Sequence, residues 1–261
     1  MRDAEHKFAA EGVHSVTASG DVRCSDNADI LLHPASTLKL LTAYVALRNL
    51  GHSALGNMVL VHEEDRYEGR KAPKFQLGAG ISVEDLFYLL ALSSHNGAAR
   101  ILARYAGELA TGARAGKAYG AFLGMMRSQV SEWGWKGAQI ECAAGLAPGS
   151  RLTALWLCEL MLRLAETEPW LLSVLGSSSR RVEISHATCD SIVVEHTISG
   201  AQRESLDGFV AGKTGTIAGT YGSLVVLSKS QRGKLLSTAV LRAVPAEARF
   251  ADAAVILAGC R

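Results

Sequence analysis

The sequence predicts an α+β fold in which strands from distant parts of the chain complete one antiparallel sheet. Two observations support this prediction. Strand-like segments stand near the start of the chain and in its last third, and the long stretch between them has helical patterns. Strands and helices that are segregated along a sequence, instead of alternating, favour an α+β architecture.

The chain begins with an expected strand pair and then a long helix. Residues 13–19 contain several β-branched side chains, and a turn separates them from residues 22–24, so a hairpin is expected. Pro34 precedes residues 37–50, where apolar side chains recur at helical spacing. Gly51 is well placed to end this helix, and loop with short strand follows.

More helices are expected through the middle of the chain. Ser82 and Asp85 have the spacing of a capping residue with an acid three positions later, so a helix begins there and ends before residues 93–97. Thr153 is a preferred type of capping residue for another helix. The other expected helices cover residues 98–105, 118–133 and 153–164.

The last third of the chain changes to strand patterns. β-Branched and apolar runs are separated by turn residues, and residues 231–234 are typical of a hairpin. Pro245 then marks the start of a final helix. The expected strands cover residues 191–196, 209–216, 223–228 and 235–243.

The composition is that of an ordinary globular domain. The 261 residues are 48% hydrophobic and 20% charged, with a formal net charge of +2 and no long basic run, so nucleic acid is a poor candidate partner. We expect one domain of two interleaved lobes, a sheet lobe (residues 1–35 and 185–261) and a helical lobe (residues 36–184). No run approaches a membrane helix, and residues 1–13 do not form a secretory signal. Either the protein is cytoplasmic or its leader has been removed, and the oligomeric state stays open.

Neither the cysteines nor the histidines indicate a metal or cofactor site. The cysteine count is odd, no Cys-x-x-Cys occurs, and the eight histidines are scattered. We therefore expect no metal and no cofactor, and we interpret the cysteines as small buried residues, with one disulfide left open. The cysteines are Cys24, Cys142, Cys158, Cys189 and Cys260.

Three short motifs occur in one order along the chain. They are S-x-x-K at residues 36–39, S-x-N at residues 94–96 and K-T-G at residues 213–215. Each motif alone is weak, because such short patterns arise by chance. Together, and on the expected elements, they match the motif set of β-lactamases and penicillin-binding proteins.

The first motif has the chemistry of an activated nucleophile. Ser36 and Lys39 are three residues apart on a helix and therefore share one face. Ser36 stands at the helix N-terminus, where free N–H groups favour a developing oxyanion. A serine hydroxyl needs a base, and Lys39 can serve if burial and a second cation, Lys213, lower its pKa. Alone, Ser36 would be interpreted as a helix cap.

The second motif supplies groups for proton transfer and substrate binding. Ser94 can relay a proton to the leaving amine. Asn96 offers an amide group that can hold the amide of the substrate and orient Lys39. The structural alternative is that Ser94 and Asn96 are only turn formers.

The third motif is expected on an edge strand beside the site. An extended substrate can pair with such an edge through backbone hydrogen bonds, and Gly215 has no side chain to obstruct it. The charge of Lys213 and the hydroxyls of Thr214 and Thr216 suit a terminal carboxylate. The structural alternative for Lys213 is an exposed charge that protects a sheet edge.

The likeness to one family extends beyond these motifs. Residues 34–44 resemble the active-site helix of D-alanyl-D-alanine carboxypeptidases, and residues 80–99 resemble their second motif with its approach helix. Residues 213–227 resemble the third motif and its return strand, and the similarity as a whole covers residues 13–245.

This resemblance implies a fold and an activity. The fold is β-lactamase/transpeptidase-like, with a five-stranded antiparallel sheet flanked by helices beside a mostly helical lobe. The activity is cleavage of the terminal D-alanine from peptidoglycan stem peptides ending in D-Ala-D-Ala, through an acyl-enzyme on Ser36. β-Lactam antibiotics would be covalent inhibitors, and the enzyme would act outside the cytoplasm after loss of a leader. The N–H groups of Ser36 and Thr216 would form the oxyanion hole, and Arg242 would assist carboxylate recognition.

Three positions depart from the pattern of the family. His95 and Gly97 stand where the family usually has Gly and Asp around the asparagine, and we interpret His95 as a residue that shapes the turn. Ala147 stands where the family usually has Asp or Asn, directly after the pair Gly145-Leu146. These departures concern local loop geometry and rate more than the class of reaction.

Two other functions stay open on the same fold. One is a β-lactamase with a deacylating glutamate: Glu132 and Glu141 lie in the right region, but neither is followed by the Leu-Asn pair of that class. The other is a non-catalytic domain that senses β-lactams or peptidoglycan. The intact Ser36, Lys39 and Lys213 argue against this third function.

Overall fold

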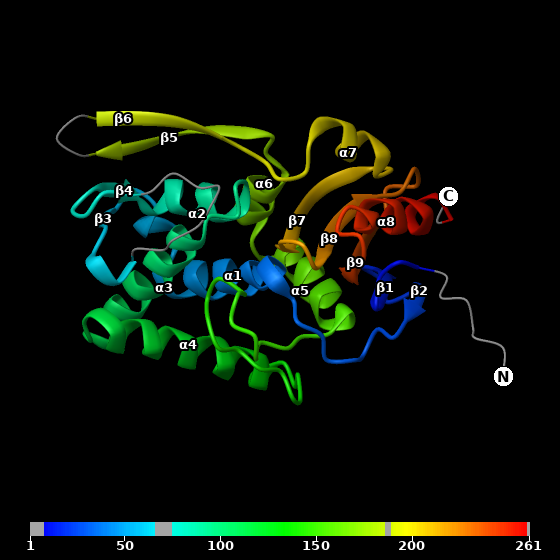
Figure 1. Ribbon diagram of the computed structural model, residues 1–261, viewed down its shortest axis with the longest axis horizontal. Coiled ribbons are helices and arrows are strands. Elements are labelled where there is room, and N and C mark those ends of the chain that lie inside the picture. Colours follow the sequence, from blue (N-terminus) through cyan, green and yellow to red (C-terminus); the bar gives the residue numbers. More distant parts are fainter. Residues whose placement is uncertain (1–7, 66–74, 186–188, 260–261) are drawn as a thin grey trace.

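The main sheet joins the two ends of the chain. The computed structural model describes residues 8–65, 75–185 and 189–259, and its main sheet has five antiparallel strands in the order β2-β1-β9-β8-β7 (Figure 1). Strand β1 pairs with β9 along its length, which confirms the predicted α+β architecture. The strands are β1 (Gly12–Thr17), β2 (Val22–Asp26), β7 (Phe209–Ile217), β8 (Tyr221–Lys229) and β9 (Leu235–Ala243).

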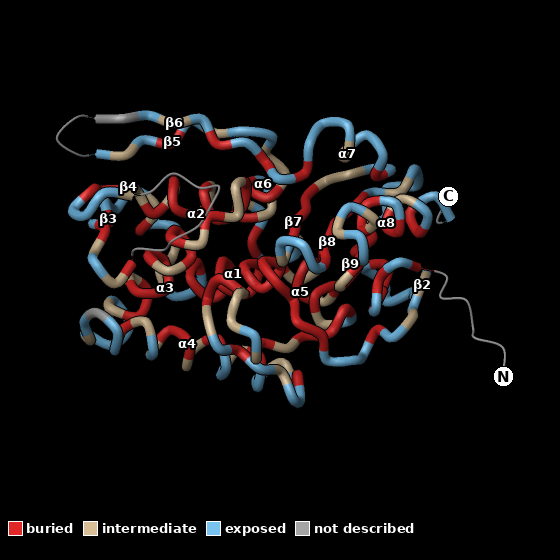
Figure 2. The backbone as a smooth tube through the Cα atoms, viewed as in Figure 1, coloured by how far each residue is buried: buried red, intermediate tan, exposed pale blue. Residues whose placement is uncertain are grey.

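A central helix carries the first motif through the core. Helix α1 is buried over most of its length, between other helices and the sheet (Figure 2). The helix expected over residues 37–50 begins with a 3-10 turn, η1, and becomes α-helical at Lys39. The helices used below are η1 (Ala35–Leu38), α1 (Lys39–Leu50), α2 (Val83–Ala91), α3 (Asn96–Thr111), α4 (Ala115–Glu132), α5 (Ala154–Thr167), α6 (Pro169–Gly176), α7 (Gly200–Ser205) and α8 (Ala248–Ala258).

Strand β8 lies inside this sheet and is buried on both faces. Successive side chains of a strand point to opposite faces. Val225 and Leu227 belong to the large core that contains α5. Leu224 and Val226 belong to a second core with the apolar side chains of α8. Because helices cover both faces, this strand is a continuous apolar run instead of an alternating one.

Two helix caps that the sequence predicts are confirmed. The hydroxyl of Ser82 accepts a hydrogen bond from the N–H of Asp85 at 3.0 Å, at the start of α2. The hydroxyl of Thr153 accepts one from the N–H of Trp156 at 3.1 Å, at the start of α5. Each cap satisfies an N–H group that a helix leaves unpaired at its N-terminus.

The sequence does not predict the second sheet, which has four strands in the order β3-β4-β5-β6. These strands are β3 (Met58–Leu60), β4 (Gly80–Ser82), β5 (Ser179–Ser185) and β6 (Cys189–Glu195). Of the four, β6 matches an expected strand, and β3 lies in the stretch after Gly51 where loop with short strand is expected. Strands β3 and β4 are three residues long, and β5 is mostly polar, so they give no clear strand pattern. The division into two lobes remains a prediction.

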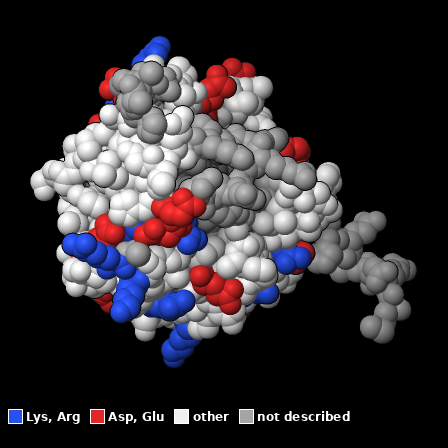
Figure 3. All heavy atoms as spheres, turned by 60° about the vertical axis from the view of Figure 1, so that its left-hand side comes forward, with Lys and Arg blue, Asp and Glu red and all other residues white. Residues whose placement is uncertain are grey.

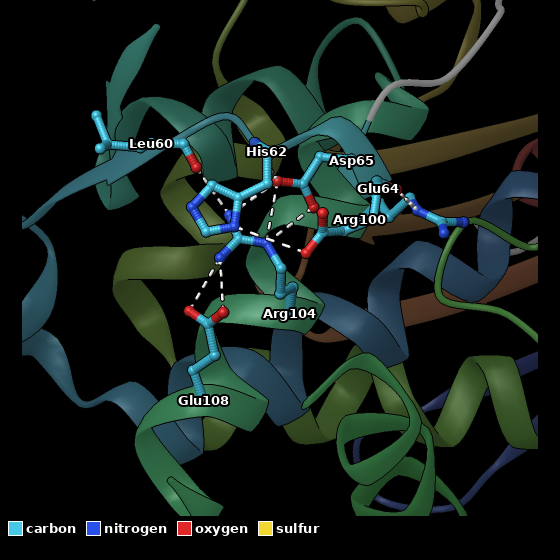
Figure 4. Close-up of polar contacts among 7 residues, drawn as sticks. All are labelled: Leu60, His62, Glu64, Asp65, Arg100, Arg104 and Glu108. Atoms are coloured by element: carbon cyan, nitrogen blue, oxygen red, sulfur yellow. Dashed lines mark hydrogen bonds and ion pairs between the residues drawn. The ribbon is translucent and has the colours of Figure 1, made fainter. Parts of the chain in front are cut away.

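A buried ion cluster holds the segment after β3 against α3 (Figure 4). Arg104 is 2% exposed, and its guanidinium donates to both carboxylate oxygens of Asp65 at 2.8 to 3.0 Å. It also donates to the carboxylate of Glu108 at 2.9 Å and to the carbonyl of Leu60 at 2.8 Å. A buried charge is tolerated when its donors are satisfied in this way. The cluster therefore anchors the helix that carries the second motif at its start.

Loss of the main counter-charge in this cluster is expected to destabilise the protein. Asp65→Asn should lower the free energy of unfolding by about 3 kcal/mol, because the guanidinium of Arg104 stays buried without its main partner. The matched variant Glu108→Gln should cost less, because that side chain is 23% exposed. Urea unfolding of both variants measures the difference, and equal losses would contradict the assignment of Asp65 as the main partner.

The surface mixes charges of both signs. On the face that Figure 3 shows, Lys and Arg groups lie beside Asp and Glu groups, in agreement with the small net charge of +2. In the described ranges, none of the helices has both the length and the apolar character needed to span a bilayer.

Candidate active site

One helical turn brings Ser36 and Lys39 together. Lys39 is completely buried, and its Nζ lies 2.8 Å from Oγ of Ser36. Two more oxygens contact the amine, Oδ1 of Asn96 at 2.7 Å and the carbonyl of Ala144 at 2.9 Å. The three-residue spacing therefore places the hydroxyl and the amine within hydrogen-bond distance.

The oxygens around Lys39 suit a neutral amine that acts as a base. A neutral amine has two N–H donors and one lone pair. In the structure the amine donates to all three oxygens. The carbonyl oxygens of Asn96 and Ala144 can only accept, so they keep the two donors of a neutral amine, and its lone pair then faces the hydroxyl of Ser36. In this state Lys39 can accept the proton of Ser36 without rearrangement.

Burial controls the protonation of both motif lysines. Loss of hydration lowers the pKa of Lys39 to about 7, while nearby Cys142 acts in the opposite direction. Burial also lowers the pKa of Lys213 well below its usual value, and the charges of Lys39 and Arg249 lower it further. The sequence predicts that burial and a second cation together lower the pKa of Lys39, and in the structure burial is the cause that lowers it. Repulsion between the two ammonium groups disfavours their simultaneous protonation.

Acylation by a penicillin is expected to accelerate as the pH rises through about 7 and then to level off. Only the neutral amine of Lys39 can accept the proton of Ser36, and the neutral fraction grows as the pH passes the lowered pKa. The second-order rate constant of acylation, measured from about pH 5 to about pH 9, gives this profile. A rate that rises only near the ordinary pKa of lysine would contradict the lowered value.

The second motif lies where α2 gives way to α3. Asn96 is the first residue of α3, and its side-chain oxygen accepts from Lys39. Ser94 precedes the helix with a φ of +57°, in the left-handed region that disfavours residues with a side chain. Residues held in such strained conformations cluster at active sites, so the backbone of Ser94 agrees with its place in the motif.

The start of α3 explains two departures from the family pattern. His95 is the N-cap residue, and its Nδ1 accepts from the N–H of Ala98 at 3.1 Å. The imidazole stacks on Phe75 with the ring centroids 4.3 Å apart. Gly97 leaves room for this ring, because a Cβ there would lie 3.0 Å from Cε1 of His95. His95 therefore shapes the turn that precedes Asn96.

Strand β7 brings the third motif against the first. A Cβ on Gly215 would lie 2.9 Å from the backbone nitrogen of Ser36, which is closer than real Cβ atoms come, so glycine permits this approach. Lys213 is two residues earlier on β7 and is completely buried. Lys39 is near enough for its charge to lower the pKa of Lys213. The structure thus brings residues from all three motifs into one site.

The two threonines of β7 have different surroundings. Thr214 is buried and donates its hydroxyl hydrogen to Oγ1 of Thr197 at 2.7 Å. Thr216 is exposed, and its hydroxyl accepts from Nη1 of Arg249 at 2.9 Å. Arg249 is 5% exposed and reaches the strand from α8, where it also lies 3.4 Å from the carbonyl of Gly215. A guanidinium therefore lies at the end of the third motif.

The structure does not bring Arg242 together with the other predicted site residues. Arg242 lies on β9, and its Nε pairs with a carboxylate oxygen of Glu11 at 2.9 Å. Its guanidinium also lies over the ring of Tyr221, 4.7 Å from the centroid. Sequence reasoning missed Arg249, whose only signal is a cation on the apolar side of the last helix, beside Phe250. Of these two arginines, Arg249 is the one that contacts the third motif.

The loop between α4 and α5 completes the surroundings of Lys39. It supplies the carbonyl of Ala144, which accepts from the amine. The sulfur of Cys142 accepts the N–H groups of Leu146 and Ala147, both at 3.2 Å. The thiol thus orders the loop whose carbonyl holds the base. Sequence reasoning missed this contact because a backbone carbonyl leaves no signal in the residue type.

The cysteines have no common role. Cys142 and Cys158 are free thiols, and burial raises the pKa of Cys158 to about 12. The side chains of Cys189 and Cys260 lie outside the described part of the chain. Within the described ranges, no group of three or more His, Cys, Asp or Glu side chains could hold a metal ion.

Comparison with known proteins identifies the family. A family model described as D-alanyl-D-alanine carboxypeptidase matches residues 5–244. The chain belongs to this family. This carboxypeptidase is similar in structure to the DD-transpeptidase of Streptomyces K15, with a TM-score of 0.85, 20% identity and 98% of each chain covered. It is also similar to the D-alanyl-D-alanine carboxypeptidase DacD from Francisella tularensis, with a TM-score of 0.80 and 19% identity, over 99% of this chain and 72% of that chain.

The family match confirms the resemblance carried by the three motifs. A comparison with curated protein sequences gave no match. The solved structures share about a fifth of their residues with this carboxypeptidase, so they show its fold, and its serine peptidase activity follows from the family. The predicted β-lactamase/transpeptidase-like fold is confirmed.

Proposed function

We propose that this carboxypeptidase removes the terminal D-alanine of peptidoglycan stem peptides through an acyl-enzyme on Ser36. The observation that carries the proposal is the buried amine of Lys39, 2.8 Å from the hydroxyl of Ser36. Neutral Lys39 takes the hydroxyl proton as Ser36 attacks the carbonyl carbon of the scissile bond. Lys39 then gives this proton to the hydroxyl of Ser94, which passes its own hydrogen to the nitrogen of the leaving D-alanine as the C–N bond breaks. Water afterwards hydrolyses the ester and releases the acyl group from Ser36. Members of this family act on the cell wall outside the cytoplasm, and we place this chain there as well.

The oxyanion is assigned to the junction of the first and third motifs. The N–H groups of Ser36 and Thr216 would stabilise the developing negative charge. This assignment is supported by the close approach of Gly215 to the backbone nitrogen of Ser36. Gly215 places no side chain between β7 and the turn η1, so both N–H groups can donate to the same substrate oxygen.

The terminal carboxylate of the substrate is assigned to the end of β7. Lys213 and Arg249 supply positive charge there, and the hydroxyl of Thr216, which accepts from Arg249, keeps its hydrogen for the carboxylate. Arg249 takes the place that the sequence analysis gave to Arg242. A substrate that pairs with the edge of β7 would bring its carboxylate to these groups.

The contacts of two glutamates disfavour a β-lactamase. The carboxylate of Glu141 accepts from the N–H of Gly149 at 3.0 Å, so it is bonded within the loop between α4 and α5. Glu132 accepts from Gln129 at 3.0 Å on the surface of α4. Neither bond is directed at Ser36, where a deacylating water would have to be activated.

Release of D-alanine tests the proposed function. The protein is incubated with a peptide that ends in D-Ala-D-Ala, and free D-alanine is measured. We expect steady release of D-alanine and, in a parallel experiment, a long-lived adduct with penicillin. Rapid hydrolysis of penicillin without D-alanine release would support a β-lactamase, and an adduct with neither activity would support a sensor.

A further inference from the structure

The segment between β6 and α7 links the second motif to the third. The N–H of Thr197 donates to the carbonyl of Leu92 at 2.9 Å, two residues before Ser94. The preceding residue, His196, is buried, and its Nε2 lies 3.2 Å from the carbonyl of Gly212 in β7. The backbone at Thr197 is therefore held from both sides, by the loop of the second motif and by the strand of the third.

A neutral imidazole fixes this segment. Burial lowers the pKa of His196 to about 3, and the charges of Lys213 and Arg203 act in the same direction. The Nδ1 atom accepts from the N–H of Ile198 at 2.8 Å, so the ring hydrogen is on Nε2. Nε2 faces two backbone carbonyls, one of them on β7. The ring therefore sets the position of Thr197 relative to the third motif without adding charge.

The hydroxyl of Thr197 keeps its own hydrogen available. Thr214 is the donor in the bond of 2.7 Å between the two hydroxyls, so this bond uses a lone pair of Thr197. Within the described part of the chain, no other group is bonded to the Thr197 hydroxyl. The Thr197 side chain is exposed, whereas Thr214 is 4% exposed. A hydroxyl that accepts one hydrogen bond becomes a better donor for a second.

We propose that Thr197 is a further substrate-binding residue, whose hydroxyl donates a hydrogen bond to the terminal carboxylate of the substrate. The inference rests on the proposed function, in which this carboxylate lies along β7. Thr214 is then the buried donor that orients the hydroxyl of Thr197, and the exposed hydroxyl of Thr197 donates to the substrate carboxylate. The third motif thus works together with a residue that belongs to none of the motifs.

Thr197→Val tests this role, because it keeps the shape of the side chain and removes the hydroxyl. We expect KM for a peptide ending in D-Ala-D-Ala to rise about tenfold, with kcat changed by less than about threefold. Thr197→Ser should restore KM. Ser191→Ala in β6, which removes an exposed hydroxyl bonded to Arg181 of β5, is the matched control and should leave KM unchanged.

A second measurement separates carboxylate binding from a merely structural role. The acylation rate is measured with a penicillin and with its methyl ester, which lacks the free carboxylate. Thr197→Val should slow acylation by the acid and leave acylation by the ester unchanged. Equal slowing of both, or an unchanged KM for the peptide, would overturn the role of Thr197. If the wild type released no D-alanine, the proposed function itself would fail. That result differs from failure of the Thr197 role, in which the wild type is active and Thr197→Val behaves like it.

Discussion

Replacing Ser36 with alanine is expected to abolish the covalent adduct with penicillin and to lower D-alanine release by about 10⁴-fold or more. The hydroxyl is the atom that forms the ester, and Lys39, the base 2.8 Å away, has nothing to activate once that hydroxyl is gone. Intact mass after incubation with a penicillin measures the adduct, and a D-alanine assay measures turnover.

The matched control for this experiment is Ser94→Ala. It removes a hydroxyl from the same site and, by the roles proposed above, slows proton transfer without removing the atom that is acylated. An adduct should therefore still form, at a lower rate. An adduct that persisted in Ser36→Ala would show that the nucleophile has been assigned to the wrong residue.

Replacing Lys39 with methionine is expected to slow acylation by about 10²- to 10⁴-fold, which is the usual contribution of a general base. Methionine fills a similar volume and carries no amine, so the hydroxyl of Ser36 loses its proton acceptor. The adduct should form slowly, on Ser36, at a rate measured by mass spectrometry over time. The rise of the rate through pH 7 should also disappear, because the group with the pKa of about 7 is absent.

Lys229→Met is the control for the loss of a lysine as such. Lys229 is exposed at the end of β8, so its replacement should leave the acylation rate near that of the wild type. A urea midpoint of Lys39→Met close to that of the wild type would show that the protein remains folded. Acylation of Lys39→Met at the wild-type rate would mean that another group is the base.

Four strands of the main sheet, β1, β7, β8 and β9, could be predicted because most of their residues are buried and the chain therefore has apolar or β-branched runs there. The apolar runs at β8 and β9 follow from their burial between helices, and the range expected for β9, residues 235–243, is the range observed. The bounds of β3 and the strands β4 and β5 could not be predicted from the sequence, because pairing with neighbouring strands, and not their own composition, makes them strands. Their sequences are too short or too polar to show it.

The site could be predicted from spacing where residues are close in sequence, and across remote segments through the resemblance of the three motifs to a known family. Three residues of helix place Ser36 beside Lys39, whatever the rest of the fold does. The choice between Arg242 and Arg249 depends on which one meets β7 in three dimensions, and the sequence pattern does not encode that. The donation from Thr214 to Thr197 likewise depends on a loop that is distant from β7 until the chain folds.

The pairing of β1 with β9 also has a consequence for biogenesis. The ladder runs from Gly12 opposite Leu241 to Thr17 opposite Leu236, so β1 lacks its partner on this side until residues 236–241 have been synthesised. Contacts between such remote positions slow folding. A nascent polypeptide that ends before β9 would contain every motif residue and lack the strand that joins β1 to β8, so we expect it to be inactive until residues 235–243 have been synthesised.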